Sequence, residues 1–102
     1  MKRLFAVIRS RGAAWKHSLP LEEQEDWGLH ATFMNALQTE GFVIAGGPLE
    51  GTPDVLLIIR ASGEADILER LSADPWSGKD LLRTGRIAPW TLRLGSLEPT
   101  AQ

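Results

Sequence analysis

Short apolar runs alternate with breaks rich in glycine and proline along the chain, and their residue types are those of β-strands. The breaks include Gly12, Pro20, Gly41 and Asp74-Pro75. Between breaks, strand-forming residues dominate four stretches, which we predict to be strands: 4–8, 42–45, 55–59 and 87–94.

Two helices are expected between these strands. The first is predicted to start in the acidic stretch 22–26, where carboxylates favour a helix start, and to stop at Gly41. One face of it carries four residues at three- and four-residue spacing: Trp27, His30, Met34 and Leu37. The second helix is predicted to open at Ser62 or Gly63 and to end at Asp74, because a residue before proline disfavours helical angles.

The order strand, helix, strand, strand, helix, strand predicts the α+β class. The expected architecture is a ferredoxin-like βαββαβ sandwich with an antiparallel sheet. A length of 102 residues suits one domain. We expect that domain over residues 1–95, followed by a C-terminal tail at 96–102.

Two of the predicted strands, 42–45 and 55–59, are apolar at every position. A sheet with one face covered by helices and one face in water should alternate apolar and polar residues instead. Both faces therefore need cover, and two helices cover only one. We predict a homodimer in which a second copy covers the other face.

Composition narrows the function classes. The net charge of −2 disfavours nucleic-acid binding, which normally needs a basic surplus. The absence of cysteine excludes disulfides, thiolate nucleophiles and cysteine-based zinc sites. No apolar stretch reaches the length of a membrane span, and the run 4–8 is too short for a signal peptide. A cytoplasmic protein without membrane or nucleic-acid partners is expected.

His30 and Asp74 are the candidate catalytic residues. His30 lies on the apolar face of the first predicted helix, where it is either a hydrogen-bonded core residue or a general acid or base, since imidazole titrates near neutral pH. Asp74 either caps a further helical turn or acts as a functional carboxylate, and the two roles are compatible. We expect the two helices of this topology to run the same way, which places Asp74 toward the far end of the first helix. Contact with His30 then needs the Asp74-Pro75-Trp76 loop to fold back.

Five residues are candidates for binding a substrate. The Gly46-Gly47-Pro48 segment is predicted to be a tight turn, and its glycines allow a ligand to approach the backbone. Trp15 and Trp76 are expected in loops, where they line a pocket or pack in the core. Arg9, at a strand end, is either solvated or binds an acidic group. The set is Arg9, Trp15, Gly47, Pro48 and Trp76.

No metal site and no cofactor are expected. His17 with the carboxylates of 22–26 is the only combination that suggests a metal, and an acidic helix start explains those carboxylates more simply. No phosphate-binding glycine motif and no Ser–His–Asp pattern is present.

The chain resembles the YCII-related (YciI-like) family over about residues 3 to 95. The resemblance rests on His30-x-x-Phe33-Met34-x-x-Leu37, on Gly46-Gly47-Pro48-Leu49, on Asp74-Pro75-Trp76 and on Ile87-x-Pro89-Trp90. Within the family it is similar to a branch with an Arg-Gly-x-x-Trp loop, here residues 11–15. The resemblance implies a dimeric α/β barrel related in fold to muconolactone isomerase. It also places the family's characteristic histidine and aspartate on His30 and Asp74, and one related protein dehydrochlorinates a ring-cleavage intermediate.

Two hypotheses of function follow. The first is a cofactor-independent lyase or isomerase that acts on a small acidic organic molecule, with His30 moving a proton and Asp74 orienting the imidazole. The second is a non-catalytic module that binds a small ligand or mediates dimerisation, with a structural His30. A cavity beside His30 favours the first hypothesis, and a packed core around it favours the second.

Overall fold

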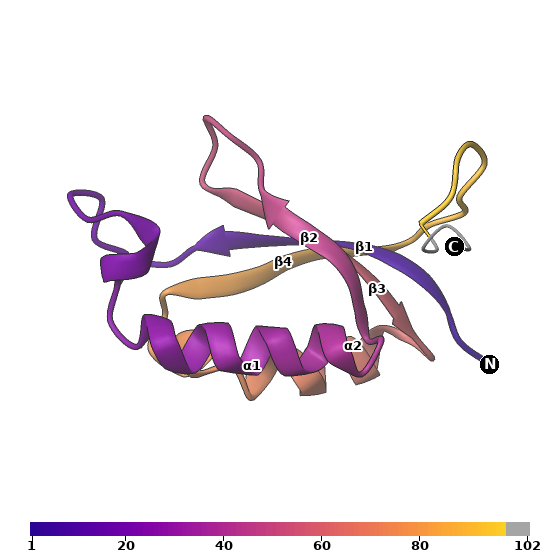
Figure 1. Ribbon diagram of the computed structural model, residues 1–102, viewed down its shortest axis with the longest axis horizontal. Coiled ribbons are helices and arrows are strands. Elements are labelled where there is room, and N and C mark those ends of the chain that lie inside the picture. The colour runs from indigo at the N-terminus through magenta and orange to yellow at the C-terminus, as the bar shows by residue number, and fades with distance from the viewer. Residues whose placement is uncertain (98–102) are drawn as a thin grey trace.

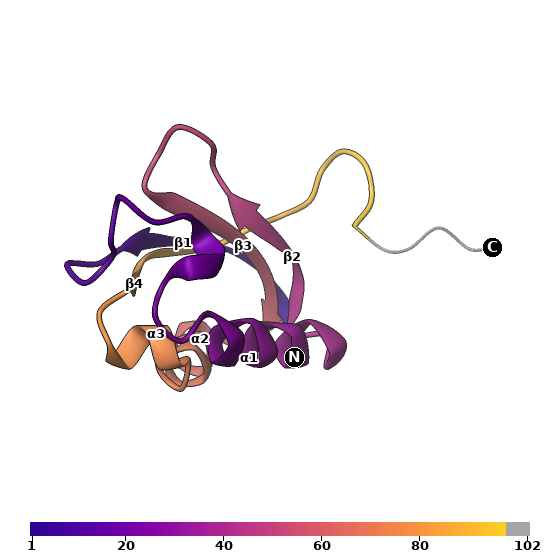
Figure 2. The ribbon, with the colours of Figure 1, turned by 60° about the vertical axis from the view of Figure 1, so that its left-hand side comes forward.

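The computed structural model describes residues 1–97. Its elements are β1 (Arg3–Arg11), η1 (Leu21–Glu23), α1 (Trp27–Thr39), β2 (Val43–Pro48), β3 (Asp54–Ala61), α2 (Glu64–Ser72), α3 (Pro75–Gly78) and β4 (Leu82–Pro89). The strands form one four-stranded sheet in the order β2-β3-β1-β4, and every neighbouring pair is antiparallel. Both long helices lie on one face of this sheet (Figures 1 and 2). The predicted α+β class and antiparallel sheet are confirmed.

The core fills the space between the sheet and the helices. Phe5 and Val7 of β1 pair with Ile59 and Leu57 of β3 and face the helices. From the helical layer, α1 contributes Leu37 to the same core, and α2 contributes Ile67 and Leu71. A second apolar cluster lies at the end of the domain where α3 meets β4, and consists of Trp15, Trp76, Leu81 and Leu82.

The relative direction of the two long helices differs from the one we expected. β3 ends beside the end of α1, where the Arg60 amide donates to the Phe42 carbonyl at 2.9 Å. From there α2 runs back along α1, so its far end approaches the first turn of α1 (Figure 1). The expectation that the two helices run the same way is therefore wrong, and Asp74 arrives on the side of His30.

The bounds predicted for the second and the last strand were also wrong. The last strand is Leu82–Pro89 rather than 87–94. Arg83, Gly85 and Arg86 lie exposed in its first part, residues 82–86. Because β4 is at the sheet edge, this part shows no run or alternation of apolar residues that would predict a strand. Residues 46–48 belong to β2 and form no tight turn, because they pair with Val55, Leu56 and Leu57 of β3. The hairpin turn instead follows at 49–53, where the Leu49 amide donates to the Asp54 carbonyl at 2.9 Å.

The first helix begins later than predicted. α1 starts at Trp27, while Glu22 and Glu23 lie in the short η1 and Asp26 takes a left-handed conformation with φ 58°. Glu25 and Asp26 both form ion pairs with Lys79, the residue that follows α3. Part of the acidic stretch therefore ties the start of α1 to the end of α3. The predicted stop at Gly41 is confirmed, with φ 82° and the Phe42 amide bonded to the Leu37 carbonyl.

No helix within residues 1–97 is long and apolar enough to cross a membrane. Of the expected tail at 96–102, residues 98–102 lie outside the described part of the chain.

Candidate functional site

Asp74 reaches His30 because the chain turns sharply after α2. Asp74 is the N-cap of α3, and its Oδ1 accepts from the Trp76 amide at 3.0 Å, with Pro75 at the first helical position. Because α2 already runs back along α1, the contact needs no further reversal of the chain, and the start of α3 holds Asp74 in place. Nδ1 of His30 lies 2.9 Å from both carboxylate oxygens of Asp74. The structure therefore brings the two candidate catalytic residues into direct contact.

A third residue, Arg9, completes a buried cluster. Its Nη1 donates to Oδ2 of Asp74 at 2.8 Å, and its Nη2 donates to Oγ of Ser77 at 2.7 Å. Arg9 and Asp74 are each only 1% exposed. Ser77 in turn donates to the Leu71 carbonyl at 2.7 Å, which ties the cluster to the end of α2. Nε of Arg9 has no partner among the described residues.

The surroundings of Asp74 keep it ionised. Burial raises the pKa of a carboxyl group, but hydrogen bonds from His30, Arg9 and the Trp76 amide outweigh burial and hold the pKa of Asp74 below its ordinary value of 3.8. An ionised carboxylate only accepts hydrogen bonds, so Nδ1 of His30 carries a proton. The neutral imidazole then has its lone pair on Nε2, which is the form a general base needs.

Trp76 fixes the plane of the imidazole. The rings of His30 and Trp76 are stacked, with centroids 3.8 Å apart and planes 5° apart. Trp76 itself is held by its indole Nε1, which donates to the Glu25 carbonyl at 2.6 Å, and by an edge contact with Trp15 at 5.6 Å. Trp27 lies against both rings, 6.0 Å from His30 and 5.9 Å from Trp76. Because neighbours fix Trp76 and Asp74, His30 has little freedom to rotate.

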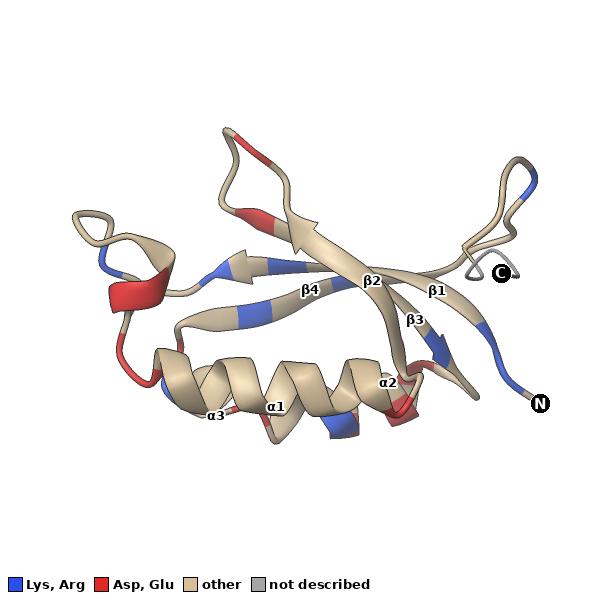
Figure 3. Cartoon of the chain, viewed as in Figure 1, with Lys and Arg blue, Asp and Glu red and all other residues tan. Residues whose placement is uncertain are grey.

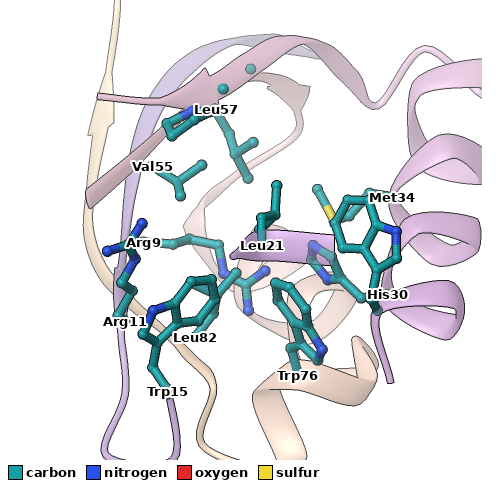
Figure 4. Close-up of a pocket in the computed structure, with 14 residues that line it drawn as sticks. Arg9, Arg11, Trp15, Leu21, His30, Met34, Val55, Leu57, Trp76 and Leu82 are labelled. Atoms are coloured by element: carbon teal, nitrogen blue, oxygen red, sulfur yellow. The ribbon is translucent and has the colours of Figure 1, made fainter. Parts of the chain in front are cut away.

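A cavity of about 270 Å³ opens beside His30 (Figure 4). All five predicted substrate-binding residues line it, although they come from β1, β2, α3 and a loop: Arg9, Trp15, Gly47, Pro48 and Trp76. Asp74 lies behind His30 and is not among the lining residues. Of these residues, Arg9 has both terminal nitrogens bound inside the protein, so its binding of a substrate group stays a prediction.

The sequence reasoning missed several cavity residues, of which Arg11 is the most informative. The first strand was predicted to end at residue 8, whereas β1 continues to Arg11. A longer strand places Arg9 and Arg11 on one face, since side chains alternate. Trp27, Leu21 and Met34 also line the cavity. For Trp27 and Met34, the shared helix face with His30 was a usable signal.

Gln24 shapes the loop that carries Leu21 to the cavity. Its side chain donates to the carbonyls of Lys16 and Leu19 at 2.7 and 3.0 Å and accepts from the Lys16 amide at 3.0 Å. Gln24 is buried, so these bonds replace water and hold the loop closed on itself. In this part of the protein, as elsewhere in residues 1–97, no three His, Asp or Glu side chains are grouped to hold a metal ion.

Residues 46–48 form part of two surfaces at once. Gly46, Gly47 and Pro48 line the cavity, and they also line a hollow on the opposite face of the sheet together with Leu56 and Ile58. A Cβ at Gly46 would lie 2.6 Å from Cδ2 of Leu57 and 3.1 Å from the Leu56 carbonyl oxygen, so a side chain there requires Leu57 to shift.

No family model matches the chain, and no curated protein matches it.

Asp74 is expected to make the folded protein sensitive to acid. Because its pKa is lower in the folded chain, its stabilising contribution is complete above the unfolded-state value and is lost as the pH falls through the folded one. The melting temperature of the wild type should therefore drop steeply below about pH 4. Asp74→Asn should show a shallower drop over the same window.

The control for this pH series is Asp80→Asn. The pKa of Asp80 is also lowered, by a hydrogen bond from Arg83, but this pair is exposed and screened by solvent. This variant should keep the steep acid response of the wild type. Equal acid responses in Asp74→Asn and the wild type would contradict the assignment of that response to Asp74.

Proposed function

We propose that the protein is a cofactor-independent lyase or isomerase in which His30 transfers a proton on a small acidic organic molecule. One observation carries the proposal: an imidazole anchored through Nδ1 by a buried carboxylate lies in the wall of a cavity large enough for a small molecule. A histidine held only for packing needs no cavity beside it. The alternative of a non-catalytic module has less support, because the space beside His30 is open.

The arrangement suits removal of a proton from carbon. Nε2 of neutral His30 accepts the proton, and the electron pair of the C–H bond forms a new double bond in the substrate. In a lyase, a leaving group on the neighbouring carbon departs with its bonding electrons as this double bond forms. In an isomerase, the electrons of an adjacent double bond instead shift to its far carbon, and that carbon takes the proton back from the imidazolium. Asp74 holds the ring and stabilises the imidazolium, while Arg9 balances the charge of Asp74.

Membership of the YCII-related family and a ferredoxin-like sandwich are part of this proposal. The element order and the sheet order β2-β3-β1-β4 support the sandwich. The contact between His30 and Asp74 supports the family assignment, because these are the two positions at which the family's characteristic residues fall.

The direct test is a carbon-acid screen in D₂O. Small unsaturated carboxylic acids and lactones are incubated with the protein, and proton NMR follows deuterium incorporation at carbon, movement of a double bond or loss of a leaving group. The proposal predicts at least one substrate that changes with the protein and not without it. A panel left unchanged at high protein concentration would argue for the binding module instead.

The homodimer is proposed to form through the sheet face that the helices leave uncovered. Register places Leu4, Ala6 and Ile8 of β1 on that face, opposite Arg60, Ile58 and Leu56 of β3. Apart from Arg60 at one end, these side chains are apolar and lie next to one another over neighbouring strands, as expected for an interface core. Leu57 points the other way, into the core, so a charge at Leu57 would unfold the chain rather than only separate two copies.

Leu56→Asp is expected to convert the dimer to an 11.2 kDa monomer that keeps its fold. A carboxylate buried without a partner costs several kcal/mol, which the association would have to supply. Light scattering at micromolar concentration measures the change. Leu68→Asp is the matched control, because Leu68 is 47% exposed on α2, and it should remain dimeric. A wild type that scatters only as an 11.2 kDa species would contradict the proposed dimer.

A further inference from the structure

The cavity wall carries positive charge in a protein that is acidic as a whole. Among residues 1–97, those that line the cavity include Arg9, Arg11 and His30 and no Asp or Glu. The net charge of the chain is −2, so this concentration of basic groups is local. Basic residues lie near the arrowhead of β1 in Figure 3. A cleft lined by one sign of charge raises the local concentration of ligands of the opposite sign.

Arg11 is the cation in this wall that is available to a ligand. Arg9 is buried and spends its terminal nitrogens on Asp74 and Ser77. Arg11 is exposed, and within residues 1–97 no carboxylate pairs with it. Its guanidinium lies 4.4 Å from the ring centroid of Trp15, so the aromatic face holds it without using its donors. A planar guanidinium with free donors suits a carboxylate, which it binds through two parallel hydrogen bonds.

Packed rings connect Arg11 with His30. Arg11 lies over Trp15, Trp15 meets Trp76 edge-on, and Trp76 is stacked on His30. In Figure 4 the labelled Arg11 and His30 lie on opposite sides of the cavity, with Leu21 between them. Since Trp15 and Trp76 are buried, this separation is fixed by the core.

The space between these two ends is apolar. Its walls include Met34, Val55, Leu57 and Leu82 besides the tryptophans. The cavity of about 270 Å³ has the volume of about nine water molecules at ~30 Å³ each, which suits a ligand on the order of ten non-hydrogen atoms. The terminal nitrogens of Arg9 are already bound, and its unpartnered Nε is buried. A second anionic group on the ligand would therefore meet apolar side chains and lose its hydration without a partner.

We infer that Arg11 binds the carboxylate of the substrate, and that the substrate is a small monocarboxylic acid with an apolar body. The body lies against Trp15, and the carbon that loses its proton lies at the His30 end. This inference rests on the proposed function in treating the cavity as a substrate site. It assigns to Arg11 the anion-binding role that the sequence suggested for Arg9.

Benzoate and its neutral isostere benzamide test the inference without any need for turnover. Binding is measured by calorimetry and by the fluorescence of the cavity tryptophans. The wild type should bind benzoate about tenfold to a hundredfold more tightly than benzamide, the usual scale of a charged hydrogen-bonded contact. Arg11→Gln should lose this preference and Arg11→Lys should keep part of it, because charge remains without the paired donors.

Arg93→Gln is the matched control, since it removes the same charge from an exposed position outside the cavity. It should bind both compounds as the wild type does. Thermal melting checks that each variant is folded. Wild-type protein without a preference for benzoate would overturn the inference, and so would an Arg11→Gln variant that keeps the preference.

His30→Gln separates this inference from the proposed function. This variant should still prefer benzoate, because the anion is held at the other end of the cavity. If the preference vanishes in His30→Gln and persists in Arg11→Gln, the imidazolium holds the anion and the inference about Arg11 fails while the catalytic proposal stands. If the preference depends on Arg11 but no carbon acid reacts in D₂O, the catalytic proposal fails while Arg11 remains an anion-binding residue.

Discussion

Replacing His30 by glutamine is expected to reduce turnover in the D₂O assay by about 10²–10⁴-fold, the usual contribution of general acid–base catalysis. Glutamine keeps an amide that can donate to Asp74, but it cannot accept and release a proton near neutral pH. The melting temperature should change little, because the hydrogen bond to Asp74 is replaced rather than removed. The measurement compares the rate of deuterium incorporation for both proteins with the same substrate.

The chain provides a matched control for this substitution. His17 is its only other histidine and lies exposed in the loop before η1, outside the cavity. His17→Gln should keep the full rate. A His30→Gln protein that loses stability but retains its rate would instead mean that His30 is structural and that it does not move the proton.

Asp74→Asn is expected to lower the free energy of unfolding by about 3–5 kcal/mol, the cost of removing one partner of a buried ion pair. The substitution changes the volume little but leaves the Arg9 guanidinium buried without its counter-charge. It also replaces an acceptor that bonds His30 and caps α3. Urea or thermal unfolding measures the loss. Glu40→Gln, which breaks the exposed pair with Arg70, should cost no more than about 1 kcal/mol.

A double-mutant cycle isolates the contact between Arg9 and Asp74. Arg9→Met alone should also be strongly destabilising, because it leaves the carboxylate without its arginine. The double variant should lose clearly less than the two single losses together, since neither charge is then left alone. Additive losses would mean that the two residues stabilise the fold independently, which would contradict the direct contact at 2.8 Å.

The sequence was sufficient for the class of fold and for the placing of His30. Runs such as 55–59 mark buried strands, and the spacing of His30 with Trp27 and Met34 sets its helix face. The last strand was misplaced because Arg83, Gly85 and Arg86 are exposed on an edge strand, where side-chain burial leaves no alternating pattern.

The structure brings His30, Asp74 and Arg9 together, but the sequence did not indicate how these residues contact one another. Asp74 before proline indicated a cap, and the structure has that cap. The direction in which α2 returns along α1 is set by the packing of both helices on the sheet, and only this direction brings Asp74 to His30. The pairing of Arg9 with Asp74 crosses from β1 to α3, and no local pattern in the sequence encodes a contact over that separation.

Residues 46–48 are the single strand segment that separates the cavity from the hollow on the uncovered sheet face. If two copies associate through that face, the same backbone becomes a shared wall between the dimer interface and the ligand. Any shift of β2 that accompanies association then alters the shape of the cavity, and the bound ligand acts back on association by the same factor. A side chain at Gly46 would press on Leu57, which lines the cavity, so a substitution there changes the cavity side of this wall as well.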